Sequence, residues 1–509
     1  MTTTTPLLQV KERIVGPRGI YNIDNEWYGY RSQFIYTIGL AGMPGFGVGC
    51  CPPEYLPADI KPLSSGTYDL MREHPHFGNY IHIPSASIVC FVPAHYIEVQ
   101  ATGGTGAPTY GTKIIISDTQ TGNAVLPKAF TDAGGSLLGV FIDKYQCSNG
   151  KPDGSGTPNH TSGPGGTPLT GGIAISRPLS WPVSAIAQSG TLYSPFSLCN
   201  STALNSAATT PANNLGGVWA LVKSRGADFA PCPIWIRSQI AYLALAHAQA
   251  LLDGSGNPIG GATSKAAWMD VAPYAPKGNN NSGSDVNKTS LTFARTDLTG
   301  HTSGFAGQAS RAFTGAALIS SVAAVEHTTH NGQLSGIVDV NGNMFDTTPG
   351  LTAVGTGAGD FRLFPASAAW TSTSSNSSIT GASGVISLIA ESSASADDGI
   401  WFAAAGASNF LVAHAGGTFH PSSAFASATK RAMTETMIPR QLGTSGTQTG
   451  TNIYGGDRFY SARVNDMLPV VGGGWGVGAG AGVFSVDLGG TSGVTTGDRG
   501  ARAVRLLSA

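Results

Sequence analysis

The sequence predicts an α+β protein in which loops outnumber regular elements. Short apolar runs with β propensity lie near both ends of the chain, and one long helical pattern lies between them at residues 234–249. The 70 glycines and 30 prolines among 509 residues interrupt the chain too often for a regular alternation of strands and helices. We therefore expect a sheet-rich protein with few helices and long irregular segments.

The expected early strands are apolar runs bounded by glycine and proline. The clearest runs cover residues 34–40, 87–96, 113–117 and 139–145. Residues 45–63 (GFGVGCCPPEYLPADIKPL) separate the first two runs and carry turn-forming residues, so a loop is expected there. Near the other end, residues 483–488 are expected to form a central strand.

The best helical pattern covers residues 234–249. Ile236, Ile240 and Leu243 recur at i, i+4 and i+7, which predicts one apolar face. His247 follows on the same face at i+11, and we expect it to be a core histidine with satisfied hydrogen bonds. A shorter helix is expected at residues 218–223.

Three regions are expected along the chain: an N-terminal anchoring arm at residues 1–35, a β-rich region at 36–125, and a C-terminal domain at 126–509. The C-terminal domain contains long insertions rich in glycine, serine, threonine or asparagine, which predict loops. These insertions cover residues 149–171, 251–300 and 365–395. The last of them is either a surface insertion or a second short β layer.

Composition argues against several classes of protein. The net charge is −1 and only 11% of residues are charged, so the clustered basic residues of a nucleic-acid binder are not expected. No run approaches the ~18 apolar residues of a membrane span, and the first residues do not read as a secretory signal. The cysteines show no metal-binding spacing, which predicts buried free thiols. They are Cys50, Cys51, Cys90, Cys147, Cys199 and Cys232.

The C-terminal residues 468–509 hold the most informative pattern. A glycine cluster there includes Gly473 and Gly474 and directly precedes Trp475. Glycine permits positive φ and close approach of the backbone, so the main chain can pack around the Trp475 ring. Residues 499–506 (RGARAVRL) are expected to form one closing strand. Along that strand Arg499 and Arg505 would share a face, with packing or ion-pair roles.

This closing pattern resembles the end of a C-type-lectin-like domain, and more narrowly the formylglycine-generating-enzyme (sulfatase-modifying) superfamily and its phage tail relatives. Residues 126–150 resemble the entry strand of that fold, residues 225–250 its helix, and residues 330–350 its "GN-V-W-E" segment. The resemblance covers roughly residues 40–509. It implies a structural core motif made of Gly473, Gly474, Trp475, Phe484, Arg499, Gly500 and Asn343.

The enzyme branch of this superfamily needs two copper-binding cysteines after the glycine-aromatic motif. The matching positions hold Val477 and Gly482, and no cysteine follows Cys232. We therefore expect no enzymatic activity, no catalytic residue and no cofactor.

Other residue clusters are weak candidates for metal sites. His327 and His330 follow Glu326 in a polar loop, and a structural role is expected for them. His74 and His76 form a second loop pair, beside Glu73. Asp339, Asp397 and Asp398 carry oxygen ligands but lack a calcium-loop pattern. We expect no metal site.

The resemblance implies a phage virion protein, made in the host cytoplasm, that acts as a tail or fibre protein and binds a receptor on the host surface. Its displayed loop would be residues 489–498, whose small polar side chains are adaptable hydrogen-bonders. The expected contact residues are Thr491, Ser492, Val494, Thr495, Thr496 and Asp498. A fixed loop is expected, not a diversified one.

Alternatives remain open at this point. A capsid-decorating or head-fibre protein would use the same fold mainly for assembly. A bacterial sugar-binding protein or a formylglycine-generating-like enzyme belongs to another class. The expected partners are further copies in a homotrimer, other virion proteins through the N-terminal arm, and the receptor, with no nucleic acid and no membrane insertion.

Overall fold

A computed structural model describes the chain in separate ranges. Residues 35–102 and 111–150 are described except 123, 133 and 134, and residues 221–250 and 329–354 are described except 341. The shorter described ranges are 15–16, 19–20, 173–178, 182–183, 218, 360–363, 386–387, 407–412, 453–461, 468–474, 482–490 and 499–508. Most of the expected N-terminal arm therefore lies outside the described residues, as do Trp475 and residues 491–498.

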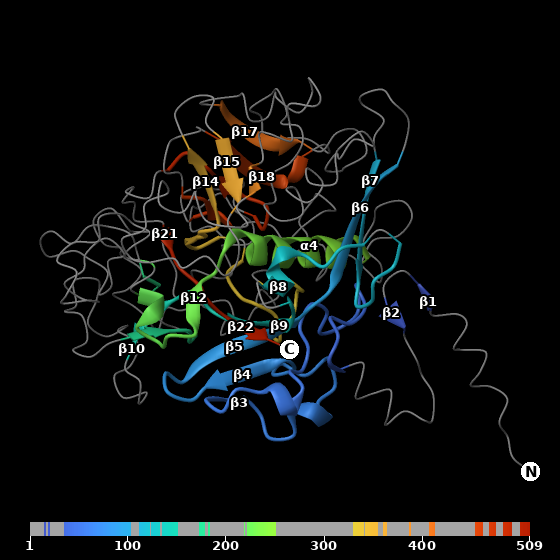
Figure 1. Cartoon of the computed structure of the whole chain (residues 1–509), viewed down its shortest axis with the longest axis vertical. Helices are drawn as coiled ribbons and strands as arrows, with labels where there is room; N and C mark the ends of the chain where they lie inside the picture. The colour runs from blue at the N-terminus through green and yellow to red at the C-terminus, as the bar shows by residue number, and fades with distance from the viewer. Residues whose placement is uncertain are drawn as a thin grey trace, which may run out of the picture.

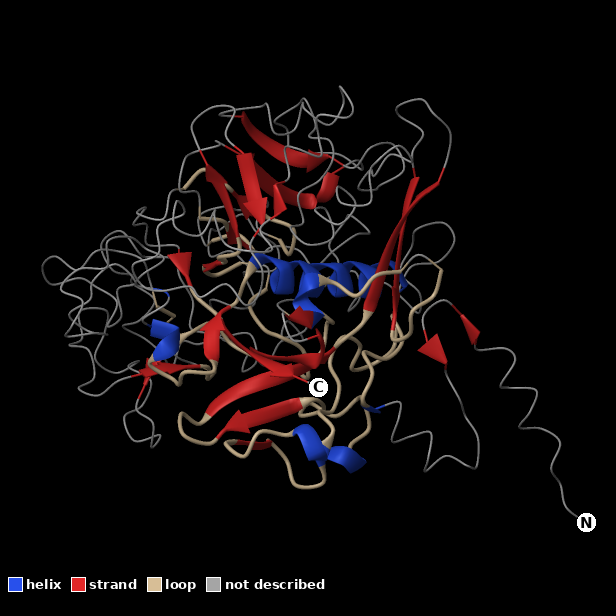
Figure 2. Ribbon diagram, in the orientation of Figure 1, coloured by secondary structure: helices blue, strands red, loops and turns tan. Residues whose placement is uncertain are grey.

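The described chain is sheet-rich and mixed α+β, with one long helix, as the sequence predicts (Figure 2). Helix α4 (Ile234–Ala250) crosses the middle of the molecule. One large sheet lies on one side of it, and the strands β14 (Leu351–Val354), β15 (Asp360–Leu363), β17 (Ala407–Val412) and β18 (Ile453–Ser461) lie on the other (Figure 1). Val218 and residues 221–223 are also helical, where the shorter helix is expected.

The large sheet has seven strands, and all of its pairings are antiparallel. Its order is β12 (Phe229–Pro231), β22 (Ala503–Ser508), β9 (Gly135–Asp143), β5 (Ser87–Pro93), β4 (Asn79–His82) and β3 (Ile60–Pro62), with β8 (Thr131–Asp132) paired to β9. The expected boundary at residues 125/126 therefore runs between strands β5 and β9, which are hydrogen-bonded to each other.

A second sheet has six strands, and three of them come from the C-terminal residues 468–509. Its order is β17 (Ala407–Val412), β18 (Ile453–Ser461), β20 (Val486–Asp487), β19 (Val470–Val471), β13 (Phe345–Thr347) and β21 (Arg499–Gly500). The strand expected at residues 483–488 is shorter than predicted, because only Val486 and Asp487 pair, but β20 does lie in the sheet interior between β18 and β19.

Smaller elements complete the described fold. Three further sheets pair β6 (Tyr96–Thr102) with β7 (Gly111–Ser117), β10 (Ser148–Gly150) with β11 (Ile173–Ile175), and β1 (Val15–Gly16) with β2 (Gly19–Ile20). A three-stranded sheet contains β14 (Leu351–Val354), β15 (Asp360–Leu363) and β16 (Ile386–Ser387). Short 3₁₀ turns are η1 (Pro53–Tyr55), η2 (Thr67–Asp69) and η3 (Lys128–Phe130).

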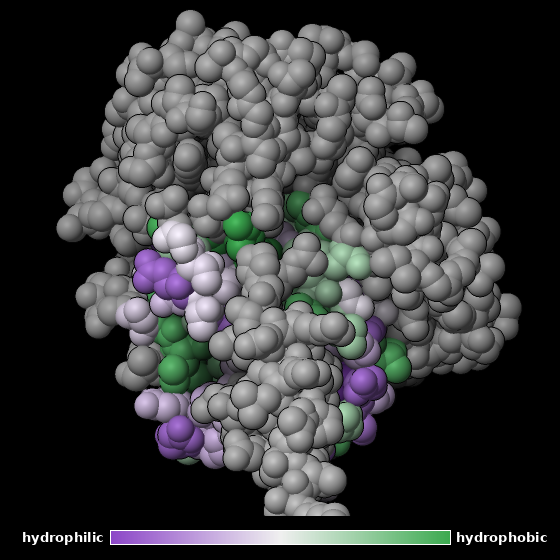
Figure 3. All heavy atoms as spheres, turned by 90° about the vertical axis from the view of Figure 1, so that its right-hand side faces the viewer, coloured by the Kyte–Doolittle hydropathy of each residue, from purple (hydrophilic) through white to green (hydrophobic). Residues whose placement is uncertain are grey.

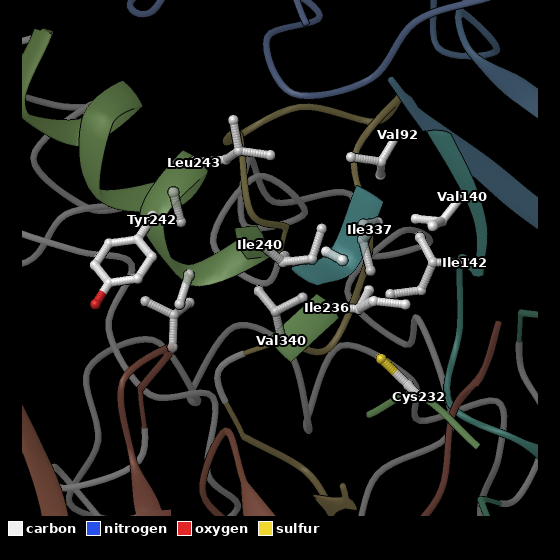
Figure 4. Close-up of a cluster of buried hydrophobic side chains, with 14 of the residues drawn as sticks. Val92, Val140, Ile142, Cys232, Ile236, Ile240, Tyr242, Leu243, Ile337 and Val340 are labelled. Carbon is white, nitrogen blue, oxygen red and sulfur yellow. The ribbon is translucent and has the colours of Figure 1, made fainter. Parts of the chain in front are cut away.

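Helix α4 is the centre of the main core. Ile236 and Ile240 lie among Val92, Val140 and Ile142 from the large sheet (Figure 4). The prediction of a single apolar face is wrong, because every residue from 234 to 245 is buried. The helix lies between two sheet layers, so its polar side is enclosed as well and must find partners inside the protein.

The strand expected at residues 34–40 does not form over residues 35–40, the part of this run that the structure describes. Residues 35–49 instead form a chain of turns, with φ of +80° at Gly39, +84° at Gly42 and +68° at Gly45. The buried Arg72 guanidinium donates to the carbonyl oxygens of Thr37 (2.7 Å), Gly45 (2.9 Å) and Val48 (3.0 Å). In a strand, backbone N–H groups would donate to these carbonyl oxygens. Here the Arg72 side chain donates to them instead.

The closing segment 499–506 is also not one strand. Residues 499–500 form β21 in the six-stranded sheet, whereas β22 begins at Ala503 in the seven-stranded sheet. Ala501 and Arg502 carry the chain from one sheet to the other, so the predicted alternation of arginines along a single strand does not apply.

The five described cysteines are free and buried, as predicted. Burial raises the pKa of the Cys50 thiol to about 12 and that of Cys90 to about 11. Cys199 lies outside the described residues. On the face seen in Figure 3, the hydrophobic and hydrophilic residues that are coloured lie in small interspersed patches.

Gly350 tests the packing around α4. A Cβ at Gly350, where φ is +111°, would lie 2.2 Å from Cζ3 of the buried Trp235. We expect Gly350→Ala to lower the free energy of unfolding by about 2–5 kcal/mol through backbone strain and overpacking together. Gly66 is the matched control, because its φ is +73° but its Cβ would meet nothing closer than 3.6 Å. Gly66→Ala should cost about 1 kcal/mol in chemical denaturation, and equal losses for the two variants would contradict the packing argument.

Candidate functional site

Arg502 lies fully buried where the two large sheets meet. Its Nε donates to Oδ2 of Asp346 at 3.1 Å. Its two terminal nitrogens donate to four backbone carbonyl oxygens, those of Asp143 (2.8 Å), Lys144 (3.1 Å), Val338 (2.8 Å) and Asp339 (3.3 Å). One side chain thus joins the end of β9, the turn at residues 338–339 and β13.

Asp346 is shared by a second buried arginine. Nε of Arg237, from the polar side of α4, donates to Oδ2 of Asp346 at 3.2 Å, and its Nη2 donates to the Val340 carbonyl oxygen. Gln146 Nε2 donates to Oδ1 of the same carboxylate at 3.1 Å. Burial alone would lower the pKa of Arg502, but Asp346 raises it above its ordinary value. One carboxylate therefore pairs with two buried guanidiniums, and burial still lowers the pKa of Arg237 below its ordinary value.

A second buried ion pair lies beside the first. Both terminal nitrogens of Arg225 donate to the two carboxylate oxygens of Asp143, and neither side chain is exposed. Oδ2 of Asp143 also accepts the backbone N–H of Ala503 at 3.1 Å. Two-point recognition of this kind fixes orientation as well as contact, so the start of β22 is held to the end of β9.

The segments that flank residues 491–498 are held by hydrogen bonds and by one buried arginine. Gly490 accepts the backbone N–H of Leu468 at 2.9 Å, and Gly489 donates to Oδ1 of Asp487 at 2.7 Å. The guanidinium of buried Arg499 lies against Gly490, where a Cβ would be 2.2 Å from its Nη2. Both ends of the expected displayed loop therefore touch each other on a buried base.

The structure places the expected core-motif residues as follows. Gly473, Gly474, Phe484, Arg499, Gly500 and Asn343 are all buried. Asn343 and Gly473 adopt positive φ, +66° and +79°. Phe484 meets Tyr242 of α4 edge to face, with ring centroids 5.7 Å apart.

Two segments that carry the resemblance lie side by side. Strand β13 runs parallel to β21, with Phe345 opposite Arg499 and Asp346 opposite Gly500. The expected contact residues Thr491, Ser492, Val494, Thr495, Thr496 and Asp498 lie outside the described residues.

Two of the histidines singled out in the sequence make hydrogen bonds within the protein. His330 is buried and its Nδ1 accepts the Ile337 N–H at 3.0 Å. The expectation that His247 is a satisfied core histidine is confirmed, because its Nδ1 accepts the Gly42 N–H at 3.1 Å and its ring stacks on Phe46. No group of three histidine, cysteine or acidic side chains able to hold a metal occurs within the described ranges.

The remaining metal candidates divide into described and undescribed residues. The rings of His74 and His76 meet edge to face, and Nδ1 of His76 pairs with the Ser64 hydroxyl. Asp339 is buried, with φ of +55°. Glu326, His327, Asp397 and Asp398 lie outside the described residues.

A hydrogen-bonded Asp–His–Ser series is present that the sequence did not reveal. Nε2 of His82 lies 3.3 Å from Oδ2 of Asp59, and its Nδ1 lies 2.7 Å from Oγ of Ser85. A nucleophilic serine needs access to substrate and a basic histidine. Ser85 is fully buried and donates to Ser87 at 2.7 Å, and burial lowers the pKa of His82 to about 4. The series therefore acts as a structural hydrogen-bond chain between β3, β4 and β5.

The buried ion network was also missed at the level of sequence. The signals were charged residues inside apolar runs: Asp143 in GVFIDKY and Arg237 in IWIRSQI. Such residues are almost never fully buried without a partner, so each one predicts a buried partner. Spacing alone does not say which residue that partner is, because Asp143 and Arg225 are 82 positions apart.

Comparison of the chain with protein-family models and with curated proteins finds no match. The described part of the chain holds no helix with the length and apolar character needed to cross a membrane.

Replacing Arg502 tests the buried network. We expect Arg502→Met to lower the free energy of unfolding by about 3–5 kcal/mol, because Asp346 loses one of its two cationic partners and four carbonyls lose their donor. Arg505→Met is the matched control, since Arg505 pairs with the partly exposed Asp59 and Asp228 at the surface. That change should cost about 1 kcal/mol or less. Urea denaturation measures both, and similar losses would contradict a special role for Arg502.

Two fully buried histidines predict a loss of stability in acid. Burial lowers the pKa of His95 to about 4 and that of His330 to about 3. Below pH ~6.5 the unfolded chain binds protons at these positions that the folded chain does not. Asp118 acts in the opposite direction, because burial raises its pKa to about 6. His82, whose pKa burial also lowers to about 4, adds to the loss. From these four groups, the net free energy of unfolding should fall by on the order of 6 kcal/mol between pH 7 and pH 4.

Chemical denaturation at the two pH values measures this loss. His330→Asn, which can keep an acceptor for Ile337, should be less stable at pH 7 but show a smaller fall towards pH 4. The control Thr121→Ala, at an exposed residue without a titratable group, should keep the full pH dependence. An unchanged pH dependence in His330→Asn would remove His330 from this account.

Proposed function

We propose that this protein is a non-enzymatic phage virion component that contacts the host surface through residues 489–498. The observation that carries the proposal is the buried base of that segment. Gly490 and Arg499 pack against each other, and the residues beyond them enter strands β20 and β21 of one sheet. A binding segment gains affinity when its ends are held before the partner arrives, because less freedom is lost on binding.

The finer fold that we propose is C-type-lectin-like, of the formylglycine-generating-enzyme type. Its support is the arrangement of the segments that resemble that superfamily. The expected entry strand β9 pairs antiparallel with the closing strand β22, with Ile142 opposite Val504. Strand β13, from the segment that resembles "GN-V-W-E", lies beside β21. Its Asp346 accepts a hydrogen bond from Arg502.

A binding role fits the chemistry of the segment better than a catalytic role. Thr491, Ser492, Thr495 and Thr496 offer hydroxyl donors and acceptors. Val477 and Gly482 stand where the oxidising enzymes of the superfamily need cysteines. The proposal places the protein in the virion, with other copies of the chain and other virion proteins as partners.

Competition for phage adsorption tests the receptor-binding proposal. Purified protein added to host cells at saturation should block adsorption. A variant with Thr491, Ser492, Thr495 and Thr496 all changed to Ala should need at least about 30-fold more protein for the same block, since four lost hydrogen bonds at a net of about 0.5–1.5 kcal/mol each amount to about 2–6 kcal/mol. Thr121→Ala, in an exposed turn elsewhere, should block like the unchanged protein.

The absence of any block at saturating protein would contradict receptor binding. Co-purification of the chain with heads that lack tails would then favour the capsid-decorating alternative.

A further inference from the structure

Residues 37–47 form a loop that side chains from other segments hold against the protein. The loop belongs to no strand or helix. Its Gly45 N–H donates to Oε1 of Gln333 at 2.6 Å. Its Phe46 carbonyl oxygen accepts a hydrogen bond from Nδ2 of Asn331 at 3.0 Å. The position of the loop therefore depends on hydrogen bonds from side chains outside it.

His247 of α4 is one of two buried histidines that contact this loop. Its Nδ1 accepts the Gly42 N–H at 3.1 Å, and its ring stacks on Phe46 with centroids 5.7 Å apart. A ring nitrogen that accepts a hydrogen bond carries no proton. A proton on Nδ1 would point at the Gly42 N–H, donor against donor, and would remove this attachment of the loop.

His330 is the second buried histidine, and the loop covers it. A Cβ at Gly47 would be 2.5 Å from Nε2 of His330 and 3.4 Å from Cδ1 of Leu243, so the loop lies directly on the ring and on α4. Nδ1 of His330 accepts the Ile337 N–H at 3.0 Å, so this nitrogen carries no proton either. The ring is fully buried, and charging it in place would leave a cation without water.

The groups around His330 also oppose a charge on its ring. Burial lowers the pKa of His330, and the nearby His247, Arg237 and Lys144 lower it further. The Phe46 carbonyl acts in the opposite direction but does not outweigh them. The closed loop therefore keeps this ring neutral far into the acid range.

Two charged groups outside the histidine pair also bond to the loop. Arg72 donates to its carbonyl oxygens and keeps its charge throughout the acid range. Oδ1 of Asp118 accepts the Ile38 N–H at 2.9 Å, and burial raises the pKa of Asp118 to about 6. A neutral carboxyl can still accept this N–H, so acid acts on the loop mainly through the two histidines.

We propose that residues 37–47 are an acid-released cover over His330 and α4, which opens while the two large sheets stay folded. In the open form the His330 ring reaches water and takes up a proton at its ordinary pKa of about 6.5. The closed form is therefore fully favoured above that pH and loses stability as the pH falls towards about 3. Uptake by His330 alone raises the open population about 25-fold between pH 7 and pH 5. The proposal does not rest on receptor binding.

Hydrogen exchange of the full chain, resolved to single amides and corrected for the intrinsic rate at each pH, tests the cover. The protection of the Gly42, Gly45 and Gly47 amides should fall by at least about 25-fold between pH 7 and pH 5. This exchange should be insensitive to low urea, because a local opening exposes little surface. The amides of β9 should stay more protected at both pH values and should depend on urea.

The double variant His247→Asn and His330→Asn tests the histidines themselves. Asparagine can keep an acceptor near each Nδ1 position and has no titratable group. The loop amides of this variant should change less than about threefold between the two pH values. His82→Asn is the matched control, because His82 is another buried histidine whose partners Asp59 and Ser85 lie outside the loop. It should keep the full change at the loop.

The measurement on the unchanged protein decides the proposal even where a variant does not fold. Equal protection of the loop amides at pH 7 and pH 5 would overturn it. So would loop amides that exchange only together with those of β9, or a folded double variant that keeps the full change.

Discussion

The fold depends on one buried guanidinium, that of Arg502. Its donors are divided between the Asp346 carboxylate and four backbone carbonyls, which come from segments far apart in the chain. A buried charge is costly unless it is paired and hydrogen-bonded, and here both conditions are met. The seven-stranded sheet, the six-stranded sheet and the turn at residues 338–339 therefore have to assemble together around this side chain.

Buried basic side chains also donate to backbone carbonyl oxygens in the glycine-rich turns, where no strand partner is present. Arg72 supplies donors to the turns at residues 37–48, and Lys144 donates to Asn79 and to the Leu334 carbonyl. Burial lowers the pKa of Lys144 to about 8. Buried basic side chains outnumber buried acids among the described residues, so backbone carbonyls supply much of the compensating negative potential.

The sequence was informative wherever local pattern decides structure. It predicted the α+β class, helix α4, the strands at β5, β7 and β9, and the buried thiols, since these depend on hydrophobic periodicity and composition. It failed where tertiary contacts decide. Residues 35–49 form turns whose carbonyl oxygens accept hydrogen bonds from Arg72, where the sequence predicts a strand. The polar side of α4 is buried because the helix lies between two sheet layers. The partners of Asp143 and Asp346 come from distant segments, and no spacing rule reveals such pairs.

The central claim is that Arg502 holds both sheets in one cooperative unit. Native-state hydrogen exchange tests it directly at three amides around this residue: Cys147, which donates to Ala501, Cys232, which donates to Arg502, and Ala503, which donates to Asp143. The account predicts that all three exchange only through global unfolding, with opening free energies equal to the global value from denaturation. Exchange of the Ala503 amide through a local opening, well below the global free energy, would contradict it.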